Sequence, residues 1–300
     1  MKRLLVVYNP RSSKFGRVKT EVLGRLKSLK GFLVGKYEVL DTDVDDNAEK
    51  LSEILEEGDL VLAAGGDATA TIAANGILKS DKKVELAVLP YGNFNDLART
   101  LKTFSFDEIF KVQKIEYWPL EIWVDGKFFR YAPCYVTIGM TAEAVEIFDD
   151  EKIRKRMQEG KKSSWRSYLQ LATWYFKNRK KKEFLPEFRL NGREMGGGFS
   201  DYAAVNGASM ARVMKGGKDY LEPKIFRSET GKLANFWNLT VLMGKSIFKQ
   251  VPGAKTEGDV LEFLTPATVE IQAEGEYRVF ENIKKIEIRK AKKCLSVLAG

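Results

Sequence analysis

Short, entirely apolar segments alternate with helical segments over residues 1–117 of this 300-residue chain, and this alternation is the strongest constraint on its fold. The segments 4–8 and 60–64 are continuous apolar runs, which are typical of strands covered on both faces. The predicted strands are 4–8, 37–41, 60–64 and 86–89, and the predicted helices are 17–30, 47–57, 69–78 and 95–101. This order predicts a parallel, doubly wound sheet.

The pattern changes after residue 117 to short strands that are separated by turns such as Asp125-Gly126 and Asn191-Gly192. The strands predicted there are 120–124, 128–132, 188–190, 201–205, 236–242, 269–272 and 286–289. The fold class is therefore α/β plus all-β, with an α/β domain over 1–117 and an antiparallel β-sandwich domain over 118–300. A return of the last ~12 residues to the first domain is left open.

The chain contains no histidine, which excludes imidazole catalysis and His-ligated zinc. Its two cysteines, Cys134 and Cys294, are too few for a disulfide framework or a four-cysteine metal site. We therefore expect buried thiols in a reducing, cytoplasmic compartment. Any acid–base chemistry must come from carboxylates, Lys or Tyr. The sequence predicts neither a targeting segment nor a membrane-spanning helix.

All of the excess positive charge lies in segment 151–182, whose twelve basic and two acidic side chains give +10, whereas the whole chain carries +9. Trp165, Tyr168, Leu169, Ala172 and Phe176 recur on one face of a predicted helix in this segment. Two interpretations are open: packing of this face on the core, or contact with an anionic membrane surface. Nucleic-acid binding is a weaker third hypothesis and is not expected.

Three polar loops follow predicted strands of the first domain: loop one (9–14), loop two (65–69) and loop three (90–96). The carboxyl edge of an open α/β sheet is where ligands bind. Loops two and three combine glycine with small polar residues at a predicted helix start, which favours phosphate. Asp67 in such a loop fits Mg²⁺ shared with phosphates, or a base beside a phosphoryl acceptor.

The motifs are Gly65-Gly66-Asp67-Ala68-Thr69 followed by Asn75-Gly76, Pro90-Tyr91-Gly92-Asn93-Phe94-Asn95-Asp96 followed by Leu97-Ala98-Arg99, and Glu274-Gly275-Glu276. In order and spacing they resemble those of the diacylglycerol kinase catalytic domain family, which includes bacterial lipid kinases and sphingosine kinases. Asn206 with Gly216-Gly217 resembles a later loop of that family. The resemblance covers most of the chain.

The resemblance implies a Rossmann-like nucleotide-binding domain and a β-sandwich, with ATP and Mg²⁺ between them. It implies transfer of the γ-phosphate to a lipid hydroxyl, such as that of diacylglycerol or a related lipid alcohol. The implied nucleotide positions are Asn9, Ser12, Ser13, Thr42, Gly65, Gly66, Ala68, Thr69, Gly92, Asn93 and Asn95. Asp67 and Glu276 fall on catalytic positions, with Glu276 as general base, and Asp67 and Asp96 fall on the acidic network near Mg²⁺.

The chain departs from the family pattern at five functional positions. Ser13 and Ala68 replace glycines, Ile72 replaces a Glu, Asn93 replaces a Thr, and Thr230 replaces an acidic residue of a structural Mg²⁺ site. Two hypotheses follow, an active kinase with altered preference and a ligand-binding member with weak or no activity. A third is an NAD kinase-like enzyme, because that class shares the Gly-Gly-Asp-Gly-Thr motif that residues 65–69 resemble. The expected partners are a lipid and the inner membrane face, with a homodimer left open.

Overall fold

The computed structural model describes residues 1–12, 14–39, 43–103, 105–139, 142, 185–195, 199–210, 214–215, 222–227 and 258–300. Several residues discussed above lie outside these ranges: the basic segment 151–182, the strand predicted over 236–242, Ser13, Thr42, Gly216, Gly217 and Thr230. In the described ranges, no helix is long and apolar enough to cross a membrane.

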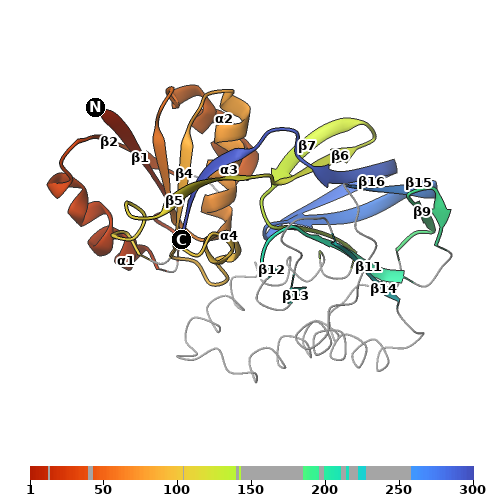
Figure 1. Cartoon of the computed structure of the whole chain (residues 1–300). Helices are drawn as coiled ribbons and strands as arrows, with labels where there is room; N and C mark the ends of the chain where they lie inside the picture. Colours follow the sequence, from red (N-terminus) through yellow and green to blue (C-terminus); the bar gives the residue numbers. More distant parts are fainter. Residues whose placement is uncertain are drawn as a thin grey trace, which may run out of the picture.

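A six-stranded sheet forms the first half of the molecule (Figure 1). Its strands, in spatial order, are β2 (Phe32–Glu38), β1 (Lys2–Tyr8), β3 (Leu60–Gly65), β4 (Glu85–Pro90), β17 (Leu295–Ala299) and β5 (Gln113–Tyr117). The first five run parallel, whereas β5 is antiparallel to β17. The C-terminal strand β17 thus lies between β4 and β5 and completes this sheet (Figure 1).

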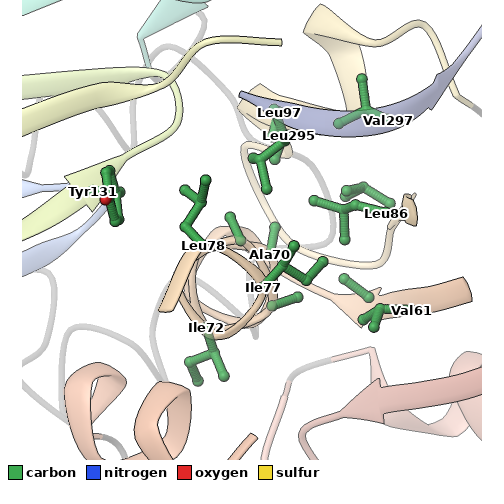
Figure 2. Packing of buried hydrophobic residues seen from close by; sticks show 14 of the residues in the cluster. Val61, Ala70, Ile72, Ile77, Leu78, Leu86, Leu97, Tyr131, Leu295 and Val297 are labelled. Carbon is green, nitrogen blue, oxygen red and sulfur yellow. The ribbon is translucent and has the colours of Figure 1, made fainter. Parts of the chain in front are cut away.

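Helices cover both faces of the first sheet because its strands β1, β3 and β4 are apolar on both faces. Alternate residues of β1 enter different cores: Leu4 and Val6 pack with the helical segments α1 (Phe15–Glu21) and η1 (Leu23–Ser28). Leu5 and Val7 pack with α2 (Val44–Ile54) and α3 (Asp67–Ser80). Side chains of α3 meet those of β3, β4 and β17, as Figure 2 shows, and burial stabilises each large apolar side chain by about 1.5–3 kcal/mol.

The second sheet is antiparallel and contains nine strands. They are β6 (Leu120–Val124), β7 (Lys127–Ala132), β8 (Tyr135–Gly139), β9 (Phe188–Leu190), β10 (Arg193–Glu194), β11 (Phe199–Val205), β14 (Glu222–Arg227), β15 (Gly258–Ala273) and β16 (Glu276–Lys290). Strands β12 (Ser209–Met210) and β13 (Met214–Lys215) form a separate pair. The predicted fold class, a parallel α/β domain followed by an antiparallel β domain, is confirmed.

The second sheet has its own apolar core, and its longest strand, β15, pairs with different strands at its two ends. Strand β15 pairs with β9 through residues 261–263 and with β8 through residues 271–273. Its pairing with β16 is irregular between these two stretches, from Glu262 to Val269. Such irregularities bend a strand, and both stretches contribute buried side chains to one apolar cluster. Residues on both sides of the irregularity therefore share one core.

Two elements of the first domain differ from the prediction. The helix predicted over 17–30 is two short helical segments that meet at Val22, and Gly24 lies in the second. Glycine is unfavourable in a helix interior, which favours this break. The strand predicted over 37–41 is β2, which starts at Phe32. As an edge strand β2 contains only partly buried and exposed residues and lacks the buried apolar run of β1.

Candidate functional site

Loops one, two and three lie together at one edge of the first sheet. They follow β1, β3 and β4 respectively, and these neighbouring strands run parallel. The strand order reverses between β1 and β3, since β2 lies on the far side of β1. In open α/β sheets the crevice at such a reversal is the usual ligand position. The topology therefore places the first two loops beside that crevice and the third next to them.

Loops two and three touch through two glycines. A Cβ on Gly66 would lie 3.2 Å from the Cα of Gly92, and a Cβ on Gly92 would overlap the Cα of Gly66. The side chain of Asn95 closes loop three: its Oδ1 accepts from the N–H of Gly92 (2.6 Å), and its Nδ2 donates to the carbonyl of Gly92 (2.9 Å). Lys14 Nζ of loop one donates to the same carbonyl (2.5 Å). The three loops therefore form one connected unit.

We expect Gly92→Ala to destabilise the protein by about 1–3 kcal/mol, because the new Cβ would also lie 2.9 Å from Asn95 Oδ1 and a backbone neighbour cannot move aside easily. Urea unfolding measures this loss. Gly16→Ala is the matched control, since no atom lies within 4 Å of a Cβ there and Gly16 is helical. Equal unfolding midpoints for the two variants would show that the loops are not in close contact.

Asp67, predicted as a catalytic and metal-binding residue, is the first residue of α3 and holds loop three. The N–H of Asn95 donates to its Oδ2 (3.0 Å) and the N–H of Asp96 to its Oδ1 (2.7 Å). Burial raises the pKa of Asp67, while these backbone hydrogen bonds lower it. Asn95 has φ 55°, a left-handed conformation that Asn tolerates, and it precedes α4 (Asp96–Thr100). Asp67 therefore fixes the start of α4 against loop two.

Asp96, the second predicted metal residue, is fully buried beside Asp67 and forms an ion pair with Arg99. Over the described part of the chain, no group of three or more Cys, Asp or Glu residues is arranged to hold a metal ion. Mg²⁺ commonly uses one or two carboxylates together with substrate phosphates, and each Asp67 oxygen has a lone pair beyond its backbone hydrogen bond. The two aspartates therefore suit Mg²⁺ in that mode.

The other predicted nucleotide residues differ in their burial and in their hydrogen bonds. Ser12 has a buried hydroxyl with no hydrogen-bond partner among the described residues, whereas Asn9 accepts from the N–H of Arg11 (2.8 Å). Gly65 leaves room for Thr69, whose Cβ would be 2.6 Å from a Cβ at position 65. Partly buried Ala68 and exposed Asn93 complete the set. An unpartnered buried hydroxyl in loop one is what a ligand oxygen would satisfy.

Glu274 is a site residue that the sequence reasoning missed, although it lies in the third motif. It is 3% exposed, and its Oε1 accepts from the N–H groups of Cys134 and Tyr135, the latter at 2.7 Å. Burial raises the pKa of Glu274 well above its usual range, and the carboxylates of Asp67 and Asp96 raise it further. The tip of the β15–β16 hairpin therefore lies close to the acidic groups of loops two and three.

Glu276, the predicted base, is the first residue of β16, partly exposed and opposite Ala273. A two-residue turn, Glu274-Gly275, joins the strands, with φ 55° and 90°. This is the left-handed geometry of a tight hairpin, for which Asn-Gly and Asp-Gly are the usual sequences. The turn places Glu276 two residues from the buried carboxyl of Glu274. A Glu-Gly pair flanked by strands is the signal that could have located this turn.

We expect Glu274→Gln to reduce the pH dependence of stability. Because folding raises this pKa above its ordinary value of 4.5, its contribution to stability is present below that pH and is lost as the pH rises through the folded pKa. Glutamine does not titrate, so the variant should lose less unfolding free energy than wild type between about pH 5 and about pH 8. Urea unfolding at several pH values measures this.

Glu274→Ala is the contrasting variant for this position. It leaves the N–H groups of Cys134 and Tyr135 without their acceptor, and we expect a loss of about 1–3 kcal/mol at every pH. Glutamine keeps an oxygen that can accept from both groups. If both variants lost stability equally, the hydrogen bonds to this side chain would not matter.

Comparisons with known proteins agree with the motifs. Residues 3–116 match the family described as diacylglycerol kinase catalytic domain. The diacylglycerol kinase of Staphylococcus carnosus is 33% identical over 102 residues, which are 33% of this chain and 33% of that protein. That of Bacillus subtilis is 34% identical over 103 residues, 34% of this chain and 33% of that protein. The match thus spans about one third of the length of these curated relatives.

The solved structures extend the likeness to the whole chain. A diacylglycerol kinase from Bacillus anthracis str. Sterne superposes with a TM-score of 0.68 and 16% identity, covering 100% of this chain and 97% of that one. At this identity the likeness concerns the fold, which is the two-domain fold that the motifs implied. The resemblance predicted from the motifs is thereby confirmed over residues 3–116, which match the model of the diacylglycerol kinase catalytic domain family.

Proposed function

We propose that this protein is an ATP-dependent lipid kinase that transfers the γ-phosphate to a lipid hydroxyl, such as that of diacylglycerol or a related lipid alcohol. One observation carries the proposal: the glycine contact of loops two and three lies beside the carboxylates of Asp67 and Asp96. Gly66 and Gly92 let loops two and three pack backbone against backbone at the start of two helices, which suits phosphates, and the buried hydroxyl of Ser12 offers a donor. The family match favours a lipid acceptor over NAD.

The two aspartates have different proposed tasks from Glu276. Asp67 and Asp96 would hold Mg²⁺, which when bound neutralises charge on the phosphates. Asp67 also keeps loop three in place through its two backbone hydrogen bonds. A carboxylate that binds Mg²⁺ accepts a proton poorly, which favours Glu276 as the base. Glu276 would take the proton of the lipid hydroxyl as that oxygen bonds to the transferred phosphorus and the bond to the leaving oxygen breaks.

A weakly active, ligand-binding protein is the second candidate function, and one observation favours it. Ile72, which stands where the family has a Glu, is 2% exposed and belongs to the apolar cluster that includes side chains of α2 and α3; it lies on the side of α3 away from Ala70 and Leu78 (Figure 2). An acidic group that contributes to the family's site is therefore replaced by an apolar core residue.

Contact of segment 151–182 with an anionic membrane is a further proposal, which vesicle sedimentation would test. A homodimer is another, which ultracentrifugation would test.

Incubation with γ-labelled ATP, Mg²⁺ and a panel of lipid alcohols tests the proposed function. We expect label in at least one lipid and none in NAD supplied in parallel. Glu276→Gln should abolish transfer while nucleotide binding, measured by calorimetry, is retained. Nucleotide binding without transfer by the wild type would identify the weakly active alternative. Label in NAD alone would reject a lipid acceptor.

A further inference from the structure

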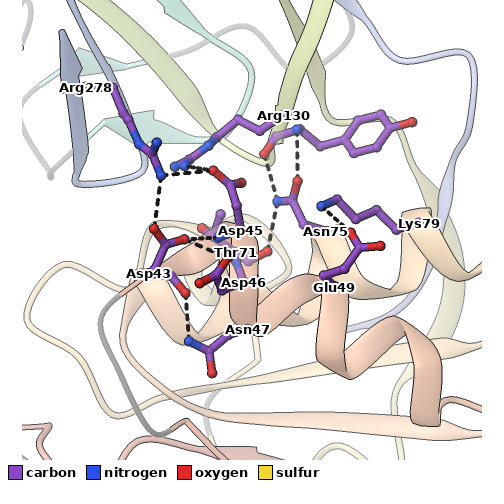
Figure 3. Close-up of polar contacts among 11 residues, drawn as sticks. Asp43, Asp45, Asp46, Asn47, Glu49, Thr71, Asn75, Lys79, Arg130 and Arg278 are labelled. Carbon is purple, nitrogen blue, oxygen red and sulfur yellow. Dashed lines mark hydrogen bonds and ion pairs between the residues drawn. The ribbon is translucent and has the colours of Figure 1, made fainter.

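A set of ion pairs joins the two domains at the start of α2. Arg130 on β7 and Arg278 on β16 pair with Asp43 and Asp45 at the start of α2 (Figure 3). The distances are 2.5 Å from Arg130 Nη2 to Asp45 Oδ2, and 3.1 Å and 3.4 Å from Arg278 Nη2 to Asp43 Oδ2 and Asp45 Oδ2. We call these four residues the ionic clasp.

The clasp has a buried half and an exposed half. The side chain of Arg130 is 1% exposed, and its guanidinium lies over the ring of Phe129 (4.5 Å). Among the described residues, Asp45 is its one carboxylate partner, because Nε and Nη1 of Arg130 have no hydrogen bond. Arg278 and Asp43 are 46% and 41% exposed and reach water. The exposed pair can therefore be altered without leaving a buried charge unpaired.

On each side of the clasp, a predicted site residue lies within two residues along the chain. Asp43 caps α2, since its carboxylate accepts from the N–H groups of Asp45 and Asp46, and residue 42 directly before it is a predicted nucleotide position. On the other side, Arg278 follows Glu276 by two residues on β16. Residues two apart on a strand share a face. The clasp thus ties the strand face that carries the proposed base to Asp43 and Asp45 at the start of α2.

We propose that Arg278 and Arg130 are positioning residues, whose ion pairs with α2 set the separation between the base on β16 and the nucleotide loops. The kinetic part of this inference rests on the proposed lipid kinase function. Transfer in line between two bound groups is sensitive to small displacements, and a misplacement of about 1 Å can cost about 10²-fold in rate. Loss of the exposed pair should therefore lower kcat more than it changes the KM for ATP.

Arg278→Met tests the clasp, with Arg25→Met as its matched control. Arg25 is 47% exposed and pairs with Asp107 inside the first domain, so the control removes an equally exposed ion pair that does not join the domains. We expect kcat to fall about tenfold or more in Arg278→Met, with the KM for ATP changed by less than about twofold. Arg278→Lys should recover part of the rate. Raising NaCl from about 0.05 M to about 0.5 M should slow wild type more than Arg278→Met.

A second variant and a ligand-free measurement separate the clasp from the proposed function. Asp43→Asn keeps the cap oxygen of α2 but removes the charge, so combined with Arg278→Met it should add no further loss. Without nucleotide, hydrogen exchange should be several-fold faster over 43–47 and 276–280 in Arg278→Met than in Arg25→Met. If wild type labels no lipid, the proposed function fails and exchange alone decides the clasp. Identical behaviour of Arg278→Met and Arg25→Met would overturn it.

Discussion

Asn75→Leu should lower the free energy of unfolding by about 3–5 kcal/mol, one of the two largest effects that we expect. Asn75 is fully buried in α3, and it hydrogen-bonds both backbone groups of Tyr131 on β7 (Figure 3). Its Oδ1 accepts from the N–H of Tyr131 (3.0 Å), and its Nδ2 donates to the carbonyl of Tyr131 (2.9 Å) and to that of Thr71 (2.9 Å).

Leucine has a similar size but no polar group, so the N–H and carbonyl of Tyr131 would lose these partners inside the domain junction. Each buried, unpaired group costs about 1–3 kcal/mol. Urea unfolding followed by circular dichroism measures the change, and Asn93→Leu at an exposed position of loop three is the control, with an expected change below about 0.5 kcal/mol. A change equally small in Asn75→Leu would show that this contact does not hold the domains together.

The roles of Asn75 and Gly76 mark what the sequence could not reveal. The dipeptide Asn75-Gly76 belongs to a family motif, and the motif predicts that both residues lie in the functional site. In the structure both residues instead hold elements together. Asn75 bonds to a strand of the other domain, and a Cβ on Gly76 would lie 2.9 Å from Leu51 Cδ2 of α2. No local pattern shows these partners, because Tyr131 and Leu51 are distant along the chain. The packing roles of such residues can be assigned only from the three-dimensional structure.

The strands and loops that the sequence predicted correctly are those marked by a pattern of neighbouring residues. Apolar runs mark β1, β3 and β4, and glycines mark the loops that follow β3 and β4, so the edge that gathers the loops follows from the sequence alone. Strand β17 gives no such signal, since its place between β4 and β5 depends on pairing across most of the chain. Glu274 was missed for a related reason. Its burial comes from contact with Cys134 and Tyr135, whereas its local sequence reads as an exposed turn.

Asp67→Asn should lower kcat for lipid phosphorylation by about 10²-fold or more while leaving the protein folded. Asp67 accepts from two backbone N–H groups, those of Asn95 and Asp96, one on each carboxylate oxygen. An asparagine amide has a single acceptor oxygen, and its NH₂ would face the second N–H, so loop three must shift. The variant also loses a negative charge that would hold Mg²⁺. Both effects act on the loops that we propose bind the phosphates.

Stability distinguishes this loss from unfolding. Burial raises the pKa of Asp67, so its charged form costs folding free energy, and removal of the charge offsets part of the lost hydrogen bond. The unfolding midpoint of Asp67→Asn should therefore stay close to that of wild type near neutral pH. Asp107→Asn, at an exposed position of the first domain, should leave both kcat and the midpoint unchanged. An undiminished rate in Asp67→Asn would mean that loop three and the metal need no carboxylate at this position, and the proposed site would then be wrong.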